Sequence, residues 1–389
     1  MIMKIAFVVQ RYGENINGGA EQHCRQLAEK MSEKHHIEVL TTTAEDYYTW
    51  ENRYPPGTEV LNGVTVRRFN SICRRGEFEH ELYKSRKEGN FGYFDDFNWM
   101  MQQGPVSPDL INYISYHRDC YDVFVFFTYL YYTTYAGLQA VPEKSVLIPT
   151  AHDEEAIYRP IFRGVFALPR AIFFNTPEEA DFVHGLFGTS VPFDVGGIGF
   201  DGLPSGDAEV FRKKYGINGK FLLYAGRITE RKGCTELFDY FSRLNSDYKL
   251  VLVGKEDIPV PKANNICSLG FVSDEDKFGA LSACDALVIP SRFESFSMVL
   301  AEAMINKKPV IACGECEVLK GHCRRSNGGI YYSGYDEFCA CVEYIANHEN
   351  RIALGENGYK YISENYRWDI IVSKLENLIN RNVLKNLKG

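Results

Sequence analysis

Several features that would indicate a specialised class of protein are missing from this sequence of 389 residues. No apolar run approaches the roughly 18 residues that a membrane-spanning helix requires. Basic residues are not in excess, because 43 Lys and Arg stand against 51 Asp and Glu, which gives a formal net charge of −8 at pH 7. A dedicated nucleic-acid-binding protein presents a basic face, so we expect no nucleic-acid partner.

Signs of export are missing as well. Residues 1–10 are apolar for only about six residues and lack a small-residue cleavage site, so they predict a first strand rather than a signal peptide. The 11 cysteines are odd in number and scattered, and we therefore expect reduced thiols in a cytoplasmic protein. One cluster has the residue types of a zinc site, namely Cys313, Cys316, His322 and Cys323. No second ligand pair follows at the usual spacing, so we predict no bound metal.

The sequence does contain a regular alternation of short β-prone apolar runs and segments of helical periodicity. This alternation predicts an α/β protein with parallel sheets covered by helices. The predicted strands are 4–10, 36–43, 64–69, 123–128, 146–150 and 171–175, followed by 221–225, 249–253, 266–269, 286–290, 309–312 and 329–332.

The two series of strands predict two Rossmann-like domains whose parallel sheets face each other across a cleft. The glycine-rich stretch 196–206 separates the series and is typical of a hinge. We therefore place an N-terminal domain at 1–200 and a C-terminal domain at 201–366. A last helix at 367–389 is expected to pack back across the interface.

Residues 70–105 interrupt this pattern. They contain basic residues, including Arg74, Arg75 and Arg86, and then several aromatic residues that end at Trp99. Long irregular insertions in compact domains are usually functional or disordered, and the aromatic content argues against disorder. We interpret the segment as a loop or lid over the cleft, with a solvated surface loop as the alternative. Its basic residues also suggest a second interpretation, in which this segment contacts anionic lipid at the inner face of the membrane.

Glu294 and Glu302 are the most informative pair of residues. Residues 286–291 predict a buried strand and 298–305 a helix, so Glu302 lies about one turn inside the helix and Glu294 in the loop before it. The unpaired N–H groups at the start of a helix favour an anion. Two carboxylates thus flank a phosphate-sized site, although an isolated pair of this spacing more often only complements the helix dipole.

Three other segments are expected at the same cleft. Gly18 and Gly19 follow the first strand and allow backbone N–H groups to approach a diphosphate. Arg227 and Lys232 flank the end of a strand and the start of the next helix, where they could neutralise a diphosphate leaving group. His152 ends a predicted strand. Each feature alone is more often a turn, a solvated charge or a structural histidine.

In this combination the chain resembles the family 4 retaining glycosyltransferases, also called glycosyl transferases group 1, which have the GT-B fold. The resemblance covers nearly the whole chain and is most specific in the second half. It rests on Gly18-Gly19-Ala20-Glu21, Gly226-Arg227 with Lys232-Gly233, and Glu294 with Glu302.

The resemblance implies a role for each matching residue. Arg227 and Lys232 would hold the donor diphosphate, Glu294 the hydroxyls of the donor sugar and Glu302 those of the ribose. His152 corresponds to a histidine near the donor sugar, and it completes the predicted catalytic set with Arg227, Lys232 and Glu294. The other predicted donor-binding residues are Gly18, Gly19 and Gly226, Phe271 and Val272 beside the base, and Ser295, Phe296, Ser297, Met298 and Val299, whose backbone would contact sugar and phosphate.

The family further implies retention of anomeric configuration without a metal or cofactor. The expected donor is a nucleoside-diphosphate sugar carrying a hexose, with a UDP-sugar favoured, and the acceptor a glycan or glycolipid hydroxyl in polysaccharide or glycoconjugate biosynthesis. One departure is Ser297, which stands where the family often has glycine. Another is the stretch 197–201, which replaces the commoner Asn-Gly-Val-Asp.

Three alternatives remain on sequence grounds. A hydrolysing nucleotide-sugar epimerase has the same architecture but needs no acceptor. A non-catalytic nucleotide-sugar-binding scaffold would bind the donor without turnover. A dinucleotide-dependent oxidoreductase is disfavoured, because Gly13, Gly18 and Gly19 do not form the G-x-G-x-x-G fingerprint.

Overall fold

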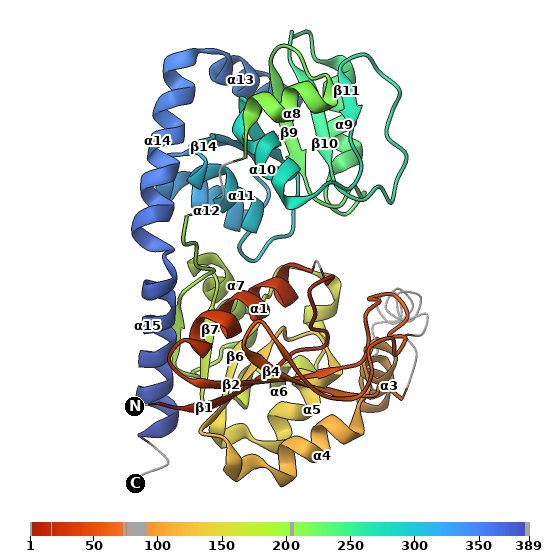
Figure 1. Cartoon of the computed structure of the whole chain (residues 1–389), viewed down its shortest axis with the longest axis vertical. Helices are drawn as coiled ribbons and strands as arrows, with labels where there is room; N and C mark the ends of the chain where they lie inside the picture. The colour runs from red at the N-terminus through yellow and green to blue at the C-terminus, as the bar shows by residue number, and fades with distance from the viewer. Residues whose placement is uncertain (1, 17, 73–74, 76–91, 203–205, 386–389) are drawn as a thin grey trace. The chain divides into compact units, whose positions relative to one another are not determined.

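The computed structural model describes residues 2–16, 18–72, 75, 92–202 and 206–385. The chain divides into two compact units (Figure 1). Unit 1 comprises Met1–Ile198 together with Trp368–Gly389, and unit 2 comprises Gly199–Arg367. Each unit contains one sheet whose strands are mostly parallel, so the predicted α/β class with two Rossmann-like domains is confirmed.

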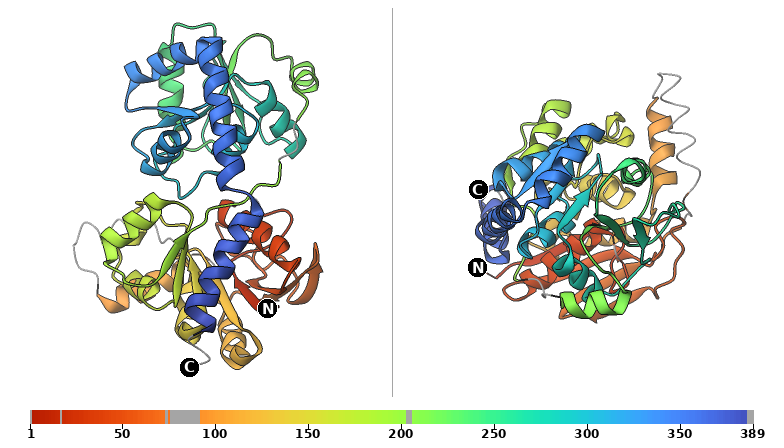
Figure 2. Two further views of the ribbon diagram at one scale, coloured as in Figure 1. Left: turned by 90° about the vertical axis from the view of Figure 1, so that its left-hand side faces the viewer. Right: turned by 90° about the horizontal axis from the view of Figure 1, so that it is seen from above.

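The sheet of unit 1 has the order β3-β4-β2-β1-β5-β6-β7-β8. Its central strands are continuous apolar runs, such as the fully buried Val123–Phe127, because helices cover both faces of the sheet (Figure 2). The strands are β1 (Lys4–Val8), β2 (His36–Thr42), β3 (Gly57–Leu61), β4 (Val64–Phe69), β5 (Val123–Phe127), β6 (Ser145–Ile148), β7 (Ala171–Phe174) and β8 (Phe193–Val195).

The helices of unit 1 form two layers. One layer contains α4 (Pro108–Tyr116), α5 (Tyr132–Ala140) and α6 (Phe162–Ala167), which pack against one another in sequence. Helix α7 (Pro177–Phe187) belongs to the same layer, because Ala180 and Val183 share its hydrophobic cluster and Phe187 stacks on Phe166 of α6. The other layer contains α1 (Gly19–Ser32) and α15 (Trp368–Ile379). Helix α15 packs against α1, β7 and β8, and a π-helical turn at Asn380–Leu384 follows it.

Three features of unit 1 differ from the sequence prediction. The sheet is not wholly parallel, because β3 pairs antiparallel with β4 through the turn at Asn62 and Gly63. Strands β3 and β8 were not predicted, since β3 is mostly exposed and β8 has only three residues. The insertion 70–105 is not irregular throughout, because α3 occupies Tyr93–Gln103. Residues 73–74 and 76–91 of that insertion lie outside the described part of the chain.

The sheet of unit 2 has the order β11-β10-β9-β12-β13-β14, and all its pairs are parallel. The chain adds β10 and β11 on one side of β9 and then returns to place β12 on the other side. The strand order therefore reverses between β9 and β12. The strands are β9 (Phe221–Ala225), β10 (Lys249–Val253), β11 (Ile266–Ser268), β12 (Ala286–Ile289), β13 (Val310–Cys313) and β14 (Gly329–Tyr332).

The helices of unit 2 alternate with these strands, and aromatic residues such as Tyr240, Phe241 and Phe338 fill the core beside them. They are α8 (Ala208–Tyr215), α9 (Cys234–Arg243), α10 (Asp274–Ala283), α11 (Met298–Ile305), α12 (Glu317–Ser326), α13 (Tyr335–Ala346) and α14 (His348–Asn365). Among the helices within the described ranges, none is both long and apolar enough to cross a bilayer.

Candidate donor-binding site

Lys232 and Glu294 meet at the point where the strand order of unit 2 reverses. Lys232 lies in the turn between β9 and α9, and Glu294 lies in the loop between β12 and α11. The ammonium of Lys232 donates to Oε1 of Glu294 over 2.7 Å. The Lys232 side chain is 39% exposed and that of Glu294 is 16% exposed, so the pair is partly open to solvent. Ligands of open α/β sheets bind outside the carboxyl ends of the strands at such a point.

Gly233 explains how the two loops come so close. Its backbone has a φ of +76°, and a Cβ atom at this position would lie 2.3 Å from the carbonyl oxygen of Pro290. The turn that carries Lys232 therefore packs directly on the end of β12, which only a residue without a side chain permits. The close contact brings Lys232 within reach of Glu294.

Arg227 pairs with a carboxylate that the sequence analysis did not identify. Its Nε lies 3.0 Å from Oδ2 of Asp257, which follows the carboxyl end of β10. The backbone beneath Arg227 is fixed, because Tyr224 donates from its hydroxyl to the Arg227 carbonyl over 2.6 Å. The N–H of Gly226 also donates to the carbonyl of Val253. The polar residues directly after the predicted strand 249–253 were the available signal for Asp257.

Glu302 is the fifth of the eight residues of α11 and is almost completely buried, with 5% exposure. Oε1 of Glu302 accepts a hydrogen bond of 2.9 Å from Nζ of Lys277, a residue of α10 that the sequence analysis missed. Burial raises the pKa of the Glu302 carboxyl, and the positive charge of Lys277 opposes that shift. The second predicted carboxylate thus also has a lysine partner.

Ser297 precedes α11 in a strained conformation. Its φ of +72° and ψ of +85° lie in the left-handed region, which favours the glycine that the resemblance leads one to expect here. The Ser297 hydroxyl is buried and has no hydrogen-bond partner among the described residues. Strained residues with unpaired polar groups cluster at functional sites, so this position merits a functional test.

The neighbouring predicted residues divide into buried and open ones. Phe296 is buried and its ring packs edge-on against Tyr366 and His322. Burial lowers the pKa of His322 to about 3, so this histidine is neutral and structural. Phe271, predicted to lie beside the base, is 72% exposed just after β11. Such an exposed aromatic ring is free to pack against a flat ligand.

The remaining predicted residues belong to unit 1. Gly18 is the N-cap of α1 and Gly19 its first residue, and the adjacent Glu21 pairs with Arg11 over 2.5 Å. His152 follows β6, and its Nε2 lies 3.5 Å from Oε2 of Glu154.

A buried carboxyl supports the segment that carries His152. Glu179, in the first turn of α7, accepts hydrogen bonds from the N–H groups of Ala151 (2.5 Å) and Asn175 (2.6 Å). It thereby connects the chain after β6 to the chain after β7. Burial raises the pKa of Glu179 to about 8, while its backbone hydrogen bonds act in the opposite direction.

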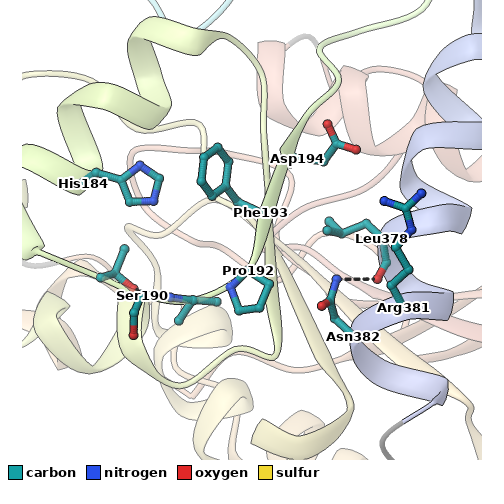
Figure 3. A pocket seen from close by; sticks show the side chains of 10 residues that line it. His184, Ser190, Pro192, Phe193, Asp194, Leu378, Arg381 and Asn382 are labelled. Carbon is teal, nitrogen blue, oxygen red and sulfur yellow. Dashed lines mark hydrogen bonds between the residues drawn. The ribbon is translucent and has the colours of Figure 1, made fainter.

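A pocket in unit 1 lies apart from these residues (Figure 3). It has a volume of about 440 Å³ and is formed by the start of β8, the preceding loop and the end of α15, with His184, Phe193 and Arg381 in its wall. Strands β6, β7 and β8 are parallel. The start of β8 therefore lies at the opposite edge of the sheet from His152, which follows the end of β6. The pocket is not part of the candidate site.

The cysteine cluster has the properties of core residues. Cys313, Cys316 and Cys323 are buried, and burial raises the pKa of each thiol. Within the described ranges, no group of three or more His, Cys, Asp or Glu side chains is arranged to hold a metal ion.

Comparisons with known proteins agree with this architecture. Residues 207–361 match the family model described as glycosyl transferases group 1. An uncharacterised glycosyltransferase of Methanocaldococcus jannaschii is 24% identical over 97% of both chains. The mannosylfructose-phosphate synthase of Agrobacterium fabrum is 31% identical over 28% of this chain and 29% of its own.

Two solved structures resemble nearly the whole chain. Sucrose-phosphate synthase from Thermosynechococcus elongatus is 16% identical, with a TM-score of 0.74 over 97% of this chain and 98% of its own. HepE of Anabaena in complex with UDP-glucose is also 16% identical, with a TM-score of 0.70 over 97% of this chain and 99% of its own. At these identities the likeness concerns the fold, which is GT-B.

Proposed function

We propose that this chain, a glycosyltransferase of group 1, transfers a hexose from a nucleoside-diphosphate sugar to an acceptor hydroxyl with retention of the anomeric configuration. The donor is a UDP-sugar, and the acceptor is a glycan or glycolipid of a polysaccharide or glycoconjugate pathway. The UDP-glucose bound by the similar HepE structure supports the choice of donor.

The observation that carries the proposal is the pairing of Lys232 with Glu294 outside the carboxyl ends of β9 and β12. An ammonium and a carboxylate at this place match the two parts of a sugar diphosphate. The ammonium suits the diphosphate, whose negative charge grows as the glycosidic bond breaks, and the carboxylate suits the sugar hydroxyls. The backbone N–H groups at the start of α11 add further donors for an anion.

The other polar residues of unit 2 fit the remaining parts of the donor. Arg227 supplies a guanidinium to the diphosphate, for which it would exchange or share its contact with Asp257. Glu302 accepts hydrogen bonds from the ribose diol. Phe271, exposed after β11, packs against the base, with Val272 beside it.

In the reaction, the acceptor oxygen forms a bond to the anomeric carbon as the bond from that carbon to the diphosphate breaks. The acceptor proton passes to an oxygen of the leaving diphosphate, so the nucleoside diphosphate is the second product. Lys232 and Arg227 stabilise its charge, and no metal ion is required. Gly18, Gly19 and His152 of unit 1 stay predictions for binding the donor phosphates and sugar.

Ligand binding followed by product analysis tests the proposal. We expect one nucleoside diphosphate among UDP, GDP, ADP and dTDP to raise the melting temperature, since a ligand stabilises the state that binds it. The corresponding sugar donor with glycan acceptors should release that nucleotide and give a product with the donor's anomeric configuration, as measured by NMR. Inversion would contradict retention, conversion of the donor without an acceptor would indicate an epimerase, and binding without turnover a scaffold.

A further inference from the structure

Lys277 connects two helices of unit 2, α10 and α11. Helix α10 starts after its N-cap Ser273, whose hydroxyl accepts from the N–H of Asp276, and Lys277 is the fourth residue of that helix. From there its ammonium reaches Oε1 of Glu302 in α11 over 2.9 Å. It also lies 3.6 Å from Oδ1 of Asp274.

The burial of the two partners is unequal. The side chain of Glu302 is 7% exposed, whereas that of Lys277 is 22% exposed. Burial raises the pKa of Glu302, and Asp274 acts in the same direction. Lys277 is the group that lowers it. Strands β12 and β13 and helix α14 also pack against α11, and within the described ranges they supply no charged group that shifts this pKa.

The two oxygens of the Glu302 carboxylate are used differently. Oε1 accepts from Lys277, whereas no described residue donates a hydrogen bond to Oε2. A ribose diol presents two hydroxyl donors, and only an ionised carboxylate accepts from both with full strength. A carboxyl that became protonated on burial would offer one acceptor fewer and a donor in its place.

We infer that Lys277 is a positioning residue of the nucleotide site, which holds the Glu302 carboxylate ionised and turned so that Oε2 receives the ribose hydroxyls. This role rests on the proposed function, because it requires that Glu302 binds the ribose. It differs from the role of Lys232, whose side chain is more exposed (39% against 22%) and pairs with a different carboxylate. Lys277 acts through Glu302 rather than on the reacting atoms.

The test compares nucleotide affinity across pH in four single variants and in the double variant that combines Lys277→Met with Glu302→Gln. Lys277→Met removes the charge at similar length, Lys277→Arg keeps the charge, and Glu302→Gln removes the carboxylate. Lys214→Met is the matched control, since Lys214 makes an equally short ion pair with Asp276 of the same helix but is exposed. Calorimetry with UDP at pH 6.0, 7.0 and 8.5 gives the dissociation constants, and circular dichroism checks folding.

We expect Lys277→Met to bind UDP about tenfold more weakly than wild type at pH 6.0 and to recover as the pH rises, because Glu302 without its lysine becomes ionised only at higher pH. UDP itself titrates in this pH range. Dividing the dissociation constant of each variant by that of wild type at the same pH removes this effect. Lys277→Arg and Lys214→Met should follow wild type at every pH. In the Glu302→Gln background, Lys277→Met should add no pH dependence, and this double variant leaves no unpaired buried charge.

Three outcomes would decide against the inference. A loss in Lys277→Met that is the same at every pH would mean that the lysine does not act through ionisation of Glu302. An unchanged affinity would remove Lys277 from the site. Both outcomes leave the proposed function intact, because wild type still binds the nucleotide. Failure of wild type to bind any nucleoside diphosphate would instead overturn the proposed function, and this role with it.

Discussion

Lys232 and Glu294 are 62 residues apart in the sequence, yet their side chains form an ion pair of 2.7 Å. The pair exists because β9 and β12 are neighbours in the sheet and because Gly233 allows the turn after β9 to pack on the end of β12. Each side chain therefore neutralises the charge of the other. In the proposed function, donor phosphate would take the place of Glu294 at Lys232, and sugar hydroxyls would take the place of Lys232 at Glu294.

The first prediction concerns this pair. Lys232→Ala should lower kcat by on the order of 10²-fold, because a donor aimed at developing charge is lost. The double variant with Glu294→Gln should lose less than the product of the two single losses, by at least about threefold, since contacting residues are not additive. Steady-state kinetics with the identified donor measures both. Lys307→Ala, which breaks an exposed ion pair with Glu356, is the control. If the loss of kcat in the double variant equals the product of the two single losses, Lys232 and Glu294 act independently in catalysis.

The second prediction separates the two glutamates. Glu302→Ala should weaken binding of the free nucleoside diphosphate by roughly 1.5–3 kcal/mol, as expected for charge-assisted hydrogen bonds to ribose. Glu294→Gln should leave that affinity unchanged and reduce kcat, because the sugar is absent from the free nucleotide. Calorimetry and kinetics on the same preparations test both. Equal losses of nucleotide affinity in the two variants would contradict the assignment of Glu294 to the sugar.

The third prediction concerns Ser297. Glycine at this position should raise the stability of the protein by about 1 kcal/mol, because it relieves the left-handed backbone and removes a buried, unpaired hydroxyl. If the hydroxyl binds the donor, Ser297→Gly should also raise the KM for the donor sugar. Asn327→Gly is the control, since Asn327 is also left-handed but exposed at the end of α12. Melting temperature and kinetics together decide, and a stabilised variant with unchanged kinetics would limit Ser297 to a structural role.

The fourth prediction concerns Glu179 and pH. Its folded pKa of about 8 lies above the unfolded value of 4.5, so the native state holds a proton that the unfolded state releases between these values. Stability from this group is therefore full below about pH 4.5 and is lost as the pH rises to about 8, by on the order of 5 kcal/mol. Glu179→Gln cannot release a proton and should lose less stability than wild type between pH 5.5 and 8.5. Melting curves recorded across this pH range measure the change in stability. Glu178→Gln is the control, because Glu178 is less buried than Glu179. Parallel pH profiles for Glu179→Gln and wild type would contradict the shift.

The fifth prediction concerns metal ions. The sequence Asp274-Glu275-Asp276 has the Asp-x-Asp pattern that often holds a metal, but Asp276 is bonded to Lys214, Tyr215 and Ser273. We therefore expect protein treated with EDTA to retain its rate of transfer. Restoration of a lost rate by Mg²⁺ or Mn²⁺ would show that the reaction requires a metal, and Asp274→Asn would then identify whether this segment binds it.

The sequence by itself determined the alternation of strands and helices. Buried parallel strands are continuous apolar runs and the helices between them have their own period, so residues 329–332 were placed correctly as β14 and residues 298–305 as α11. The sequence did not indicate β3 and β8, because these strands carry little buried apolar surface. It also did not indicate α3, because the irregular distribution of charged and aromatic residues obscured the helical periodicity. Arg227, Lys232 and Glu294 were predicted as site residues because polar residues that follow apolar strands lie together at one edge of a parallel sheet, and Glu302 because it lies about one turn inside the next helix. Their roles in binding stay predictions.

The tertiary structure alone decided the partners of those residues. Lys232 meets Glu294, Arg227 meets Asp257 and Glu302 meets Lys277 because of the order of strands in the sheet and the packing of α10 beside α11. No local pattern specifies which of several lysines lies beside a given carboxylate, since that choice depends on contacts between segments 25 to 62 residues apart. The left-handed backbone of Ser297 and the raised pKa of Glu179 likewise depend on the tertiary structure. They arise from the packing that surrounds each residue, and for that reason the sequence pattern could not indicate them.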